Sequence, residues 1–100
     1  MRLAYYYDII PAGTSKQIQF DFGININKLI LFKLETDSEL VLEASNLVDR
    51  LEGSQELSII GTLEINLELN PQQLEDVIYF KFRNDSSVDV KLFIFFKVSP

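Results

Sequence analysis

Histidine, cysteine and tryptophan are all absent from this 100-residue sequence. Without cysteine there is no disulfide framework and no thiolate metal site, and the redox compartment stays open. Without histidine the chain lacks the commonest general base, the commonest zinc ligand and the usual activator of a serine nucleophile. We therefore expect a protein that is not an enzyme and that uses no metal and no cofactor.

Long hydrophobic runs are missing as well, because no stretch approaches the roughly 18 apolar residues of a membrane-spanning helix. The N-terminus leads from Met1 directly into a polar, aromatic segment and shows no signal peptide. The net charge of −6 argues against nucleic acid, since binding to phosphates needs clustered Lys and Arg. We expect a soluble domain with no nucleic-acid partner and no membrane partner, of otherwise unknown localisation.

Acidic residues are concentrated in the middle of the chain. Residues 1–34 hold four basic and two acidic groups, residues 35–76 hold one and eleven, and residues 77–100 hold four and two. Such a distribution would suit terminal strands lying beside middle strands, or copies meeting head to tail. A solvated acidic face that aids solubility is the simpler interpretation.

Strand-like segments separated by turn residues account for most of the sequence. Segment 28–34 is apolar on both faces and predicts a central strand. Gly61 marks a bulge or sharp bend in a later strand. Ser45 or Asn46 would cap a short helix that stops at Gly53. We predict an all-β, antiparallel sandwich or jelly-roll-like fold of about 7–8 strands, with one short helix near 45–53, in a single domain, 1–100. The predicted strands are 3–10, 17–22, 28–34, 39–44, 57–60, 62–69, 77–83 and 88–98.

The last strand, 88–98, has one continuous apolar face, made of Val88, Val90, Leu92, Ile94, Phe96 and Val98. Its other face sets Phe93 and Phe95 among Asp89, Lys91 and Lys97. Leaving both rings in water would forfeit roughly 1.5–3 kcal/mol apiece relative to burial. Either the helical segment 45–53 or a neighbouring subunit should cover them, and the two lysines are placed to discourage aggregation.

Segments 77–83 and 88–98 predict a closing hairpin. A five-residue loop pairs Phe82 with Val88, Phe80 with Val90 and Ile78 with Leu92. A four-residue loop sets core residues against charges, and a three-residue loop sets Lys81 against Lys91, so we favour the five-residue loop.

Three consecutive tyrosines, residues 5–7, lie near the start of the chain, and alternation sends Tyr6 to one face and Tyr5 and Tyr7 to the other. Exposed tyrosines can anchor an interface or stack on sugars, although the run also suits an ordinary strand. The candidate interface residues are Phe93, Phe95, Tyr5, Tyr7 and Tyr79.

Two acidic groupings are weaker candidates. Asp85–Asp89 has the spacing that starts a calcium loop, but it lacks the later glycine and glutamate and equally fits a turn. Asp37 and Glu39, with Glu35 nearby, would form a carboxylate pair for acid–base chemistry only inside a cleft. Solvated turn residues are the simpler interpretation of these three.

The layout as a whole resembles small β-sandwich proteins of bacteriophage particles, such as capsid decoration, head-fibre and tail accessory proteins. The residues that carry the resemblance are the tyrosine-rich first strand, the Pro11–Thr14 turn, the segment Ile18–Gly23 and the long apolar final strand. The resemblance implies a virion component that assembles symmetrically, often as a trimer, on a larger shell. It assigns no site residues.

We therefore expect a structural or interaction protein whose partners are itself, as a homo-oligomer, and a larger protein assembly. The alternative is a carbohydrate-binding β-sandwich that uses exposed tyrosines. A hydrolase based on acidic residues is a more distant third.

Overall fold

Six antiparallel strands make up the part of the chain that the computed structural model describes, residues 2–21, 28–48, 55–69 and 77–99. All six belong to one sheet, in the order β1-β6-β3-β5-β2, with β4 paired to the other side of β3. The all-β, antiparallel prediction is confirmed. The strands are β1 (Arg2–Ile10), β2 (Ser15–Asp21), β3 (Lys28–Ser45), β4 (Leu57–Leu69), β5 (Val77–Arg83) and β6 (Val90–Ser99).

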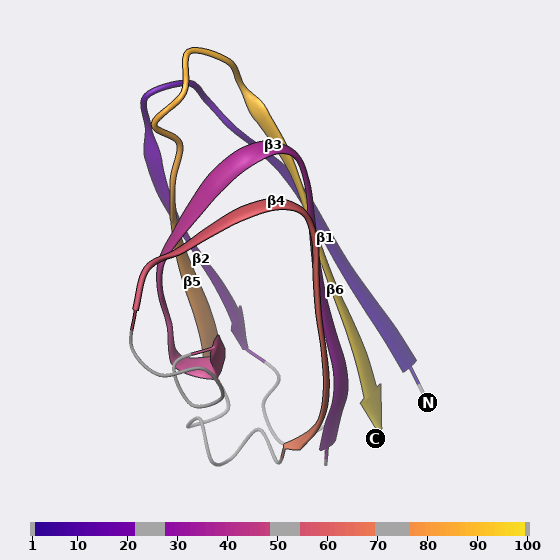
Figure 1. Ribbon diagram of the computed structural model, residues 1–100. Helices are drawn as coiled ribbons and strands as arrows, with labels where there is room; N and C mark the ends of the chain where they lie inside the picture. Colours follow the sequence, from indigo (N-terminus) through magenta and orange to yellow (C-terminus); the bar gives the residue numbers. More distant parts are fainter. Residues whose placement is uncertain (1, 22–27, 49–54, 70–76, 100) are drawn as a thin grey trace.

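The long strand β3 is central, as segment 28–34 predicted, and it joins two limbs of the sheet. It pairs with β6 through Lys28–Thr36 and with β5 through Val41–Ser45. Figure 1 shows β3 and β4 arching over so that β1 and β6 lie on one side and β2 and β5 on the other. We call β1, β6 and the first half of β3 the first limb, and β2, β5 and the second half of β3 the second limb.

The arch lies where the register of β3 and β4 shifts. Thr36 pairs with Gly61 and Leu40 with Ile59, so three residues of β3 oppose one residue of β4. Gly61 has φ +84°, a backbone conformation that favours glycine. The Thr36 hydroxyl accepts a hydrogen bond from the Gly61 amide at 3.2 Å, where the ladder is interrupted. The bulge or bend expected at Gly61 is confirmed.

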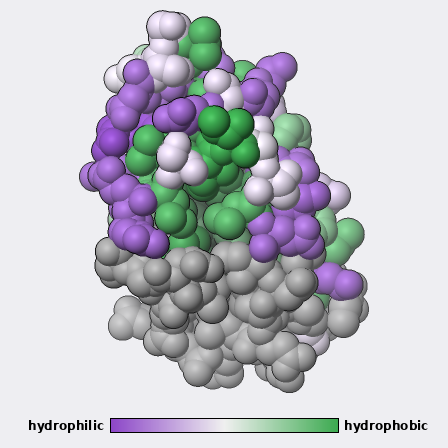
Figure 2. All heavy atoms as spheres, in the orientation of Figure 1, coloured by the Kyte–Doolittle hydropathy of each residue, from purple (hydrophilic) through white to green (hydrophobic). Residues whose placement is uncertain are grey.

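The core fills the space between the limbs. Alternating residues of β5 and β6 point inward, and the predicted core residues of both strands are buried from Val90 to Val98 and from Ile78 to Phe82. Rings from opposite limbs meet: Phe32 stacks on Phe80 at 5.3 Å, and Phe20 lies 5.1 Å from Phe96. In the same orientation, Figure 2 shows hydrophobic side chains gathered between hydrophilic flanks.

The strand count was wrong, because the described residues form six strands instead of 7–8. Segments 28–34 and 39–44 are one strand, β3, and segments 57–60 and 62–69 are one strand, β4. The polar residues between them form the irregularity at the arch, and the strands bend there without ending.

The closing hairpin was also wrong. β5 pairs with β2 and β3, and β6 pairs with β1 and β3, so none of the three expected β5–β6 pairs forms. Residues 84–89 cross from one limb to the other. Val88 lies in this crossing and is exposed, although we predicted it in the core.

The predicted helix is described only at its start. Residues 46–48 are helical, and the Ser45 hydroxyl accepts a hydrogen bond from the Val48 amide at 3.3 Å, which makes Ser45 the cap. Residues 49–53 of the helix, and residue 22 of the second predicted strand, lie outside the described residues. Within the described ranges, no helix is long and apolar enough to cross a membrane.

Candidate functional site

Four aromatic side chains lie together on the outer face of the first limb. The β1–β6 register sets Tyr5 directly opposite Phe95 and Tyr7 directly opposite Phe93. The ring centroids of Tyr5 and Phe95 are 5.0 Å apart, nearly edge to face, and those of Tyr7 and Phe93 are 4.7 Å apart. We call these four residues the aromatic band.

The aromatic band is covered only in part by its own contacts. Tyr5 is 73% exposed, Tyr7 48% and Phe93 44%, while Phe95 is half-buried. The described start of segment 45–53 gives no cover, because Asn46 bonds to β5 in the second limb, accepting from the Tyr79 amide at 3.0 Å. In the part of the chain that the structure describes, Phe93 and Phe95 are flanked by the rings of β1 on one side and by β3 on the other.

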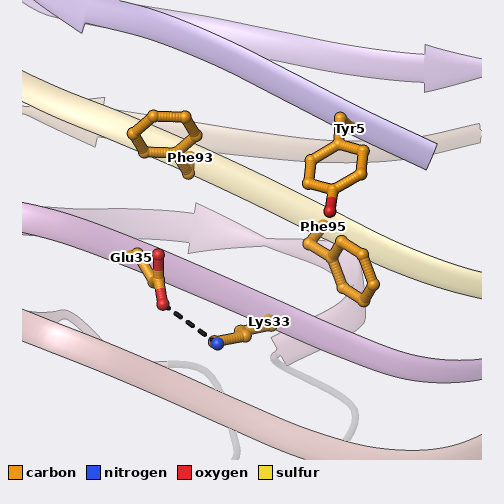
Figure 3. A pocket seen from close by; sticks show the side chains of 5 residues that line it. All are labelled: Tyr5, Lys33, Glu35, Phe93 and Phe95. Atoms are coloured by element: carbon orange, nitrogen blue, oxygen red, sulfur yellow. Dashed lines mark ion pairs between the residues drawn. The ribbon is translucent and has the colours of Figure 1, made fainter. Parts of the chain in front are cut away.

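A charged pair from β3 adjoins the aromatic band. Lys33 lies opposite Phe95 and Glu35 opposite Phe93, and the Lys33 ammonium is 3.0 Å from a Glu35 carboxylate oxygen. This hydrogen bond and the charge of Glu35 raise the pKa of Lys33. With Tyr5, Phe93 and Phe95 the pair lines a shallow, open pocket of about 270 Å³ (Figure 3).

On the inner side of β1, a separate set of hydrogen bonds and ring contacts links the strand to β2. The Tyr6 hydroxyl donates a hydrogen bond of 2.7 Å to Asp8, and the ring of Tyr6 lies edge-on to Phe20 at 5.4 Å. Burial and the neighbouring Asp8 raise the pKa of Tyr6 to about 12. Burial alone would raise the pKa of Asp8, but hydrogen bonds from Lys16 and Tyr6 outweigh it and lower that pKa. The odd and even tyrosines therefore separate as alternation predicts.

Tyr79 does not join the other candidates. It lies on β5 opposite Gln19 of β2, in the second limb. It is half-buried, and its amide is held by Asn46. The structure thus brings four of the five candidate interface residues together and leaves Tyr79 apart.

The acidic candidates are engaged elsewhere. Asp85 accepts a hydrogen bond of 2.8 Å from Arg83, and Asp89 accepts one of 3.0 Å from the Ala12 amide, so the two point to different partners. Asp37 accepts a bond of 2.8 Å from the Lys91 amide, and Glu35 pairs with Lys33. Among the described residues, no three His, Cys, Asp or Glu side chains gather to hold a metal ion.

Sequence reasoning missed the Lys33–Glu35 pair. The signal was available, because two opposite charges two residues apart share a face of a strand. Segment 28–34 was interpreted only as a strand apolar on both faces, so the pair was not set beside the aromatic residues.

Comparison with known proteins finds a fold and no family. No family model matches the chain, and no curated protein matches it either. Among solved structures, a de novo designed double-stranded β-helix matches with a TM-score of 0.58 and 11% identity, covering 94% of this chain and 99% of the other. The Yersinia pseudotuberculosis-derived mitogen matches with a TM-score of 0.54 and 13% identity, covering 98% and 86%. At these identities the likeness shows the β fold alone.

Proposed function

We propose that this protein is a non-enzymatic structural or interaction protein that assembles with copies of itself and with a larger protein assembly through the aromatic band. One observation carries the proposal: four rings lie side by side on regular strands, and three of them, Tyr5, Tyr7 and Phe93, are 44–73% exposed. Covering the exposed part of each ring would gain a fraction of the roughly 1.5–3 kcal/mol that full burial of such a side chain is worth. Tyrosine and phenylalanine are also enriched at protein interfaces, and Lys91 and Lys97 on the same face of β6 supply a polar rim.

We propose a virion as the larger assembly, on the strength of the sequence layout that resembles phage β-sandwich proteins. The two solved structures described above are not phage proteins and do not bear on that role. For the whole chain we propose a jelly-roll-like sandwich. Two facing limbs with a shared core, and the likeness to a double-stranded β-helix, support that topology.

The test of assembly is molecular mass in solution over a range of concentrations, for the wild type and for two matched variants. Tyr7→Asp places a charge in the aromatic band, and Tyr79→Asp makes the same change in the second limb. We expect an oligomer that Tyr7→Asp dissociates and Tyr79→Asp preserves, with both variants folded by circular dichroism. A wild-type monomer at high concentration, or equal effects of the two variants, would contradict the proposal.

Carbohydrate binding is the second candidate, favoured by the pocket at the aromatic band. Tyr5, Phe93 and Phe95 offer faces on which a sugar ring can stack, and Lys33 with Glu35 offers hydrogen-bonding groups beside them. The test is tyrosine fluorescence during titration with a glycan panel. A saturable change that Glu35→Gln weakens would support this function, and an unchanged signal across the panel would oppose it.

A further inference from the structure

We infer that a second copy of this chain pairs with the outer edge of β1, antiparallel and about a twofold axis at Tyr6. The inference rests on the proposed function and names the partner and the strand. Among the described residues β1 pairs with no strand other than β6, and its Ile9 amide donates to the Asp8 carboxylate at 2.7 Å. The other backbone groups along its outer edge are placed to pair with another strand in register.

The side chains of β1 that point to the outer face of the sheet, which we call its outer row, lack the features that normally prevent an edge strand from pairing with another molecule. The outer row consists of four uncharged residues, and the strand pairs with β6 over nine residues without a register shift. Leu3 is 54% exposed and Ile9 41%, on either side of the two tyrosines. Natural sheets protect such edges with charge, proline, bulges or short length.

The other two edge strands of the described sheet do have such features. The outer row of β2 is entirely polar, and β4 is bent by Gly61 at a register shift. Strand addition is therefore favoured at β1 over β2 and β4. The outer row of β2 consists of Ser15, Gln17, Gln19 and Asp21.

The occupant that fits is a second copy, because β1 is nearly palindromic in character. Pairing all nine residues of two antiparallel copies centres the contact on Tyr6. It then sets Leu3 opposite Ile9 of the other copy and Tyr5 opposite Tyr7, with Asp8 opposite Ala4. No like charges face each other, and Asp8 is already paired with Lys16 of its own chain. A twofold contact also closes on itself, so no fibre results.

Charge does not oppose this partner. The acidic middle of the chain would make two copies repel, but β1 holds one basic and one acidic residue, Arg2 and Asp8, so pairing two copies of it brings no net charge together. A standard interface takes about 800 Å² per partner, more than one strand edge provides, so we expect a dimer that dissociates on dilution.

The pairing joins the aromatic bands of two copies into one continuous surface. Each band ends at the β1 edge, and Tyr5 and Tyr7 of one copy would lie beside Tyr7 and Tyr5 of the other. That surface remains open on its outer side, where the larger assembly would dock.

Thiol cross-linking tests the register, because the chain has no cysteine of its own. Tyr5→Cys and Tyr7→Cys are made as separate variants, one carrying a tag, and mixed under mild oxidation, so that a disulfide forms between directly opposite residues and not between diagonal ones. We expect the mixture to form a cross-linked heterodimer several times faster than either variant forms a homodimer. The other tyrosine pair of the interface stays intact in that heterodimer. Gln17→Cys mixed with Gln19→Cys gives the same geometry on β2 and should not cross-link.

Each other outcome is decisive. An oligomer of the wild type in which the mixture shows no advantage would overturn β1 pairing and leave assembly through the aromatic band standing. Equal cross-linking of the β2 control would overturn it in the same way. A wild-type monomer at every concentration would overturn both the pairing and the proposed function.

Discussion

The side-chain amide of Asn84 donates a hydrogen bond of 2.9 Å to the backbone carbonyl of Ile10, a residue 74 positions earlier in the sequence. The same amide donates to the Val88 carbonyl at 2.8 Å, and its oxygen accepts from the Ser86 amide at 3.0 Å. The Asn84 backbone amide donates to Thr14 at 2.9 Å. One fully buried asparagine thus ties together two described crossings between the limbs, residues 11–14 and 84–89.

Replacing this side chain should destabilise the fold. Asn84→Ala leaves the buried carbonyl of Ile10 without this donor and removes the contacts to Val88 and Ser86, so we expect the free energy of unfolding to fall by about 2–3 kcal/mol. Urea denaturation measures the change. Ser87→Ala, at an exposed site of the same crossing, is the control and should change stability by less than about 0.5 kcal/mol. Equal effects would show that the crossings are not anchored by Asn84.

Asn84 also explains why the faces of the strands were predictable and their partners were not. Alternation is a local property, so Ile78, Phe80 and Phe82 were placed in the core from sequence alone. Burial of these side chains does not specify which strands lie beside β5. In the structure Phe80 has Ile18 as its neighbour on β2 and Ser45 as its neighbour on β3. The choice between a hairpin and a crossing depends on bonds to residues 10–14, far away in the chain.

The candidate site was predictable to a similar extent. Tyr5, Tyr7, Phe93 and Phe95 were recognised separately, because each is aromatic on a face shared with polar or exposed positions. Their meeting depends on the β1–β6 pairing between opposite ends of the chain, which no local pattern encodes. Tyr79 is also a tyrosine on a strand, like Tyr5 and Tyr7. It differs from them in the strand with which its own strand pairs, and the local sequence does not show that difference.

Two phenylalanines of β6 provide a test of the face assignment. Phe96 is 1% exposed and packs against Phe20, Phe32 and Phe80, whereas Phe93 lies on the outer face. We expect Phe96→Ala to lower the free energy of unfolding by about 3–5 kcal/mol and Phe93→Ala to cost about 1 kcal/mol. Both variants remove the same ring from the same strand, so a comparable loss in urea denaturation would mean that Phe93 is also core.

The backbone conformation of Gly61 in the arch predicts that substitutions there lower the stability of the fold by different amounts. A Cβ at this position meets no atom within 4 Å, so the cost of a substitution lies in the backbone conformation. We expect Gly61→Ala to destabilise by about 1–2 kcal/mol and Gly61→Asn by less, because asparagine tolerates positive φ. Thermal unfolding would order the wild type first, then Gly61→Asn, then Gly61→Ala. Equal stability of all three would show that the arch does not need a left-handed residue.

Asp8 should make the protein sensitive to acid. Its pKa in the folded state is lowered from the ordinary 3.8, so it contributes stability that is present above pH 3.8. That contribution is lost as the pH falls through the lowered value. Asp8→Asn should therefore flatten the dependence of unfolding free energy on pH below about 4. An acid limb that is as steep in Asp8→Asn as in the wild type would rule out this role.

Tyr6 gives the opposite dependence at high pH. Its pKa rises from 10.0 to about 12 in the folded state, so the folded protein holds that proton more tightly than the unfolded chain does. The stabilisation is complete below pH 10 and is lost as the pH rises to about 12. Tyr6→Phe removes this titration, and we expect it to lose less unfolding free energy than the wild type over that window. At neutral pH the same variant should be less stable by about 1–2 kcal/mol, because it gives up the hydrogen bond to the Asp8 carboxylate. Parallel pH profiles for the two proteins would place the Tyr6 hydroxyl in water and remove the anchor that holds the inner side of β1.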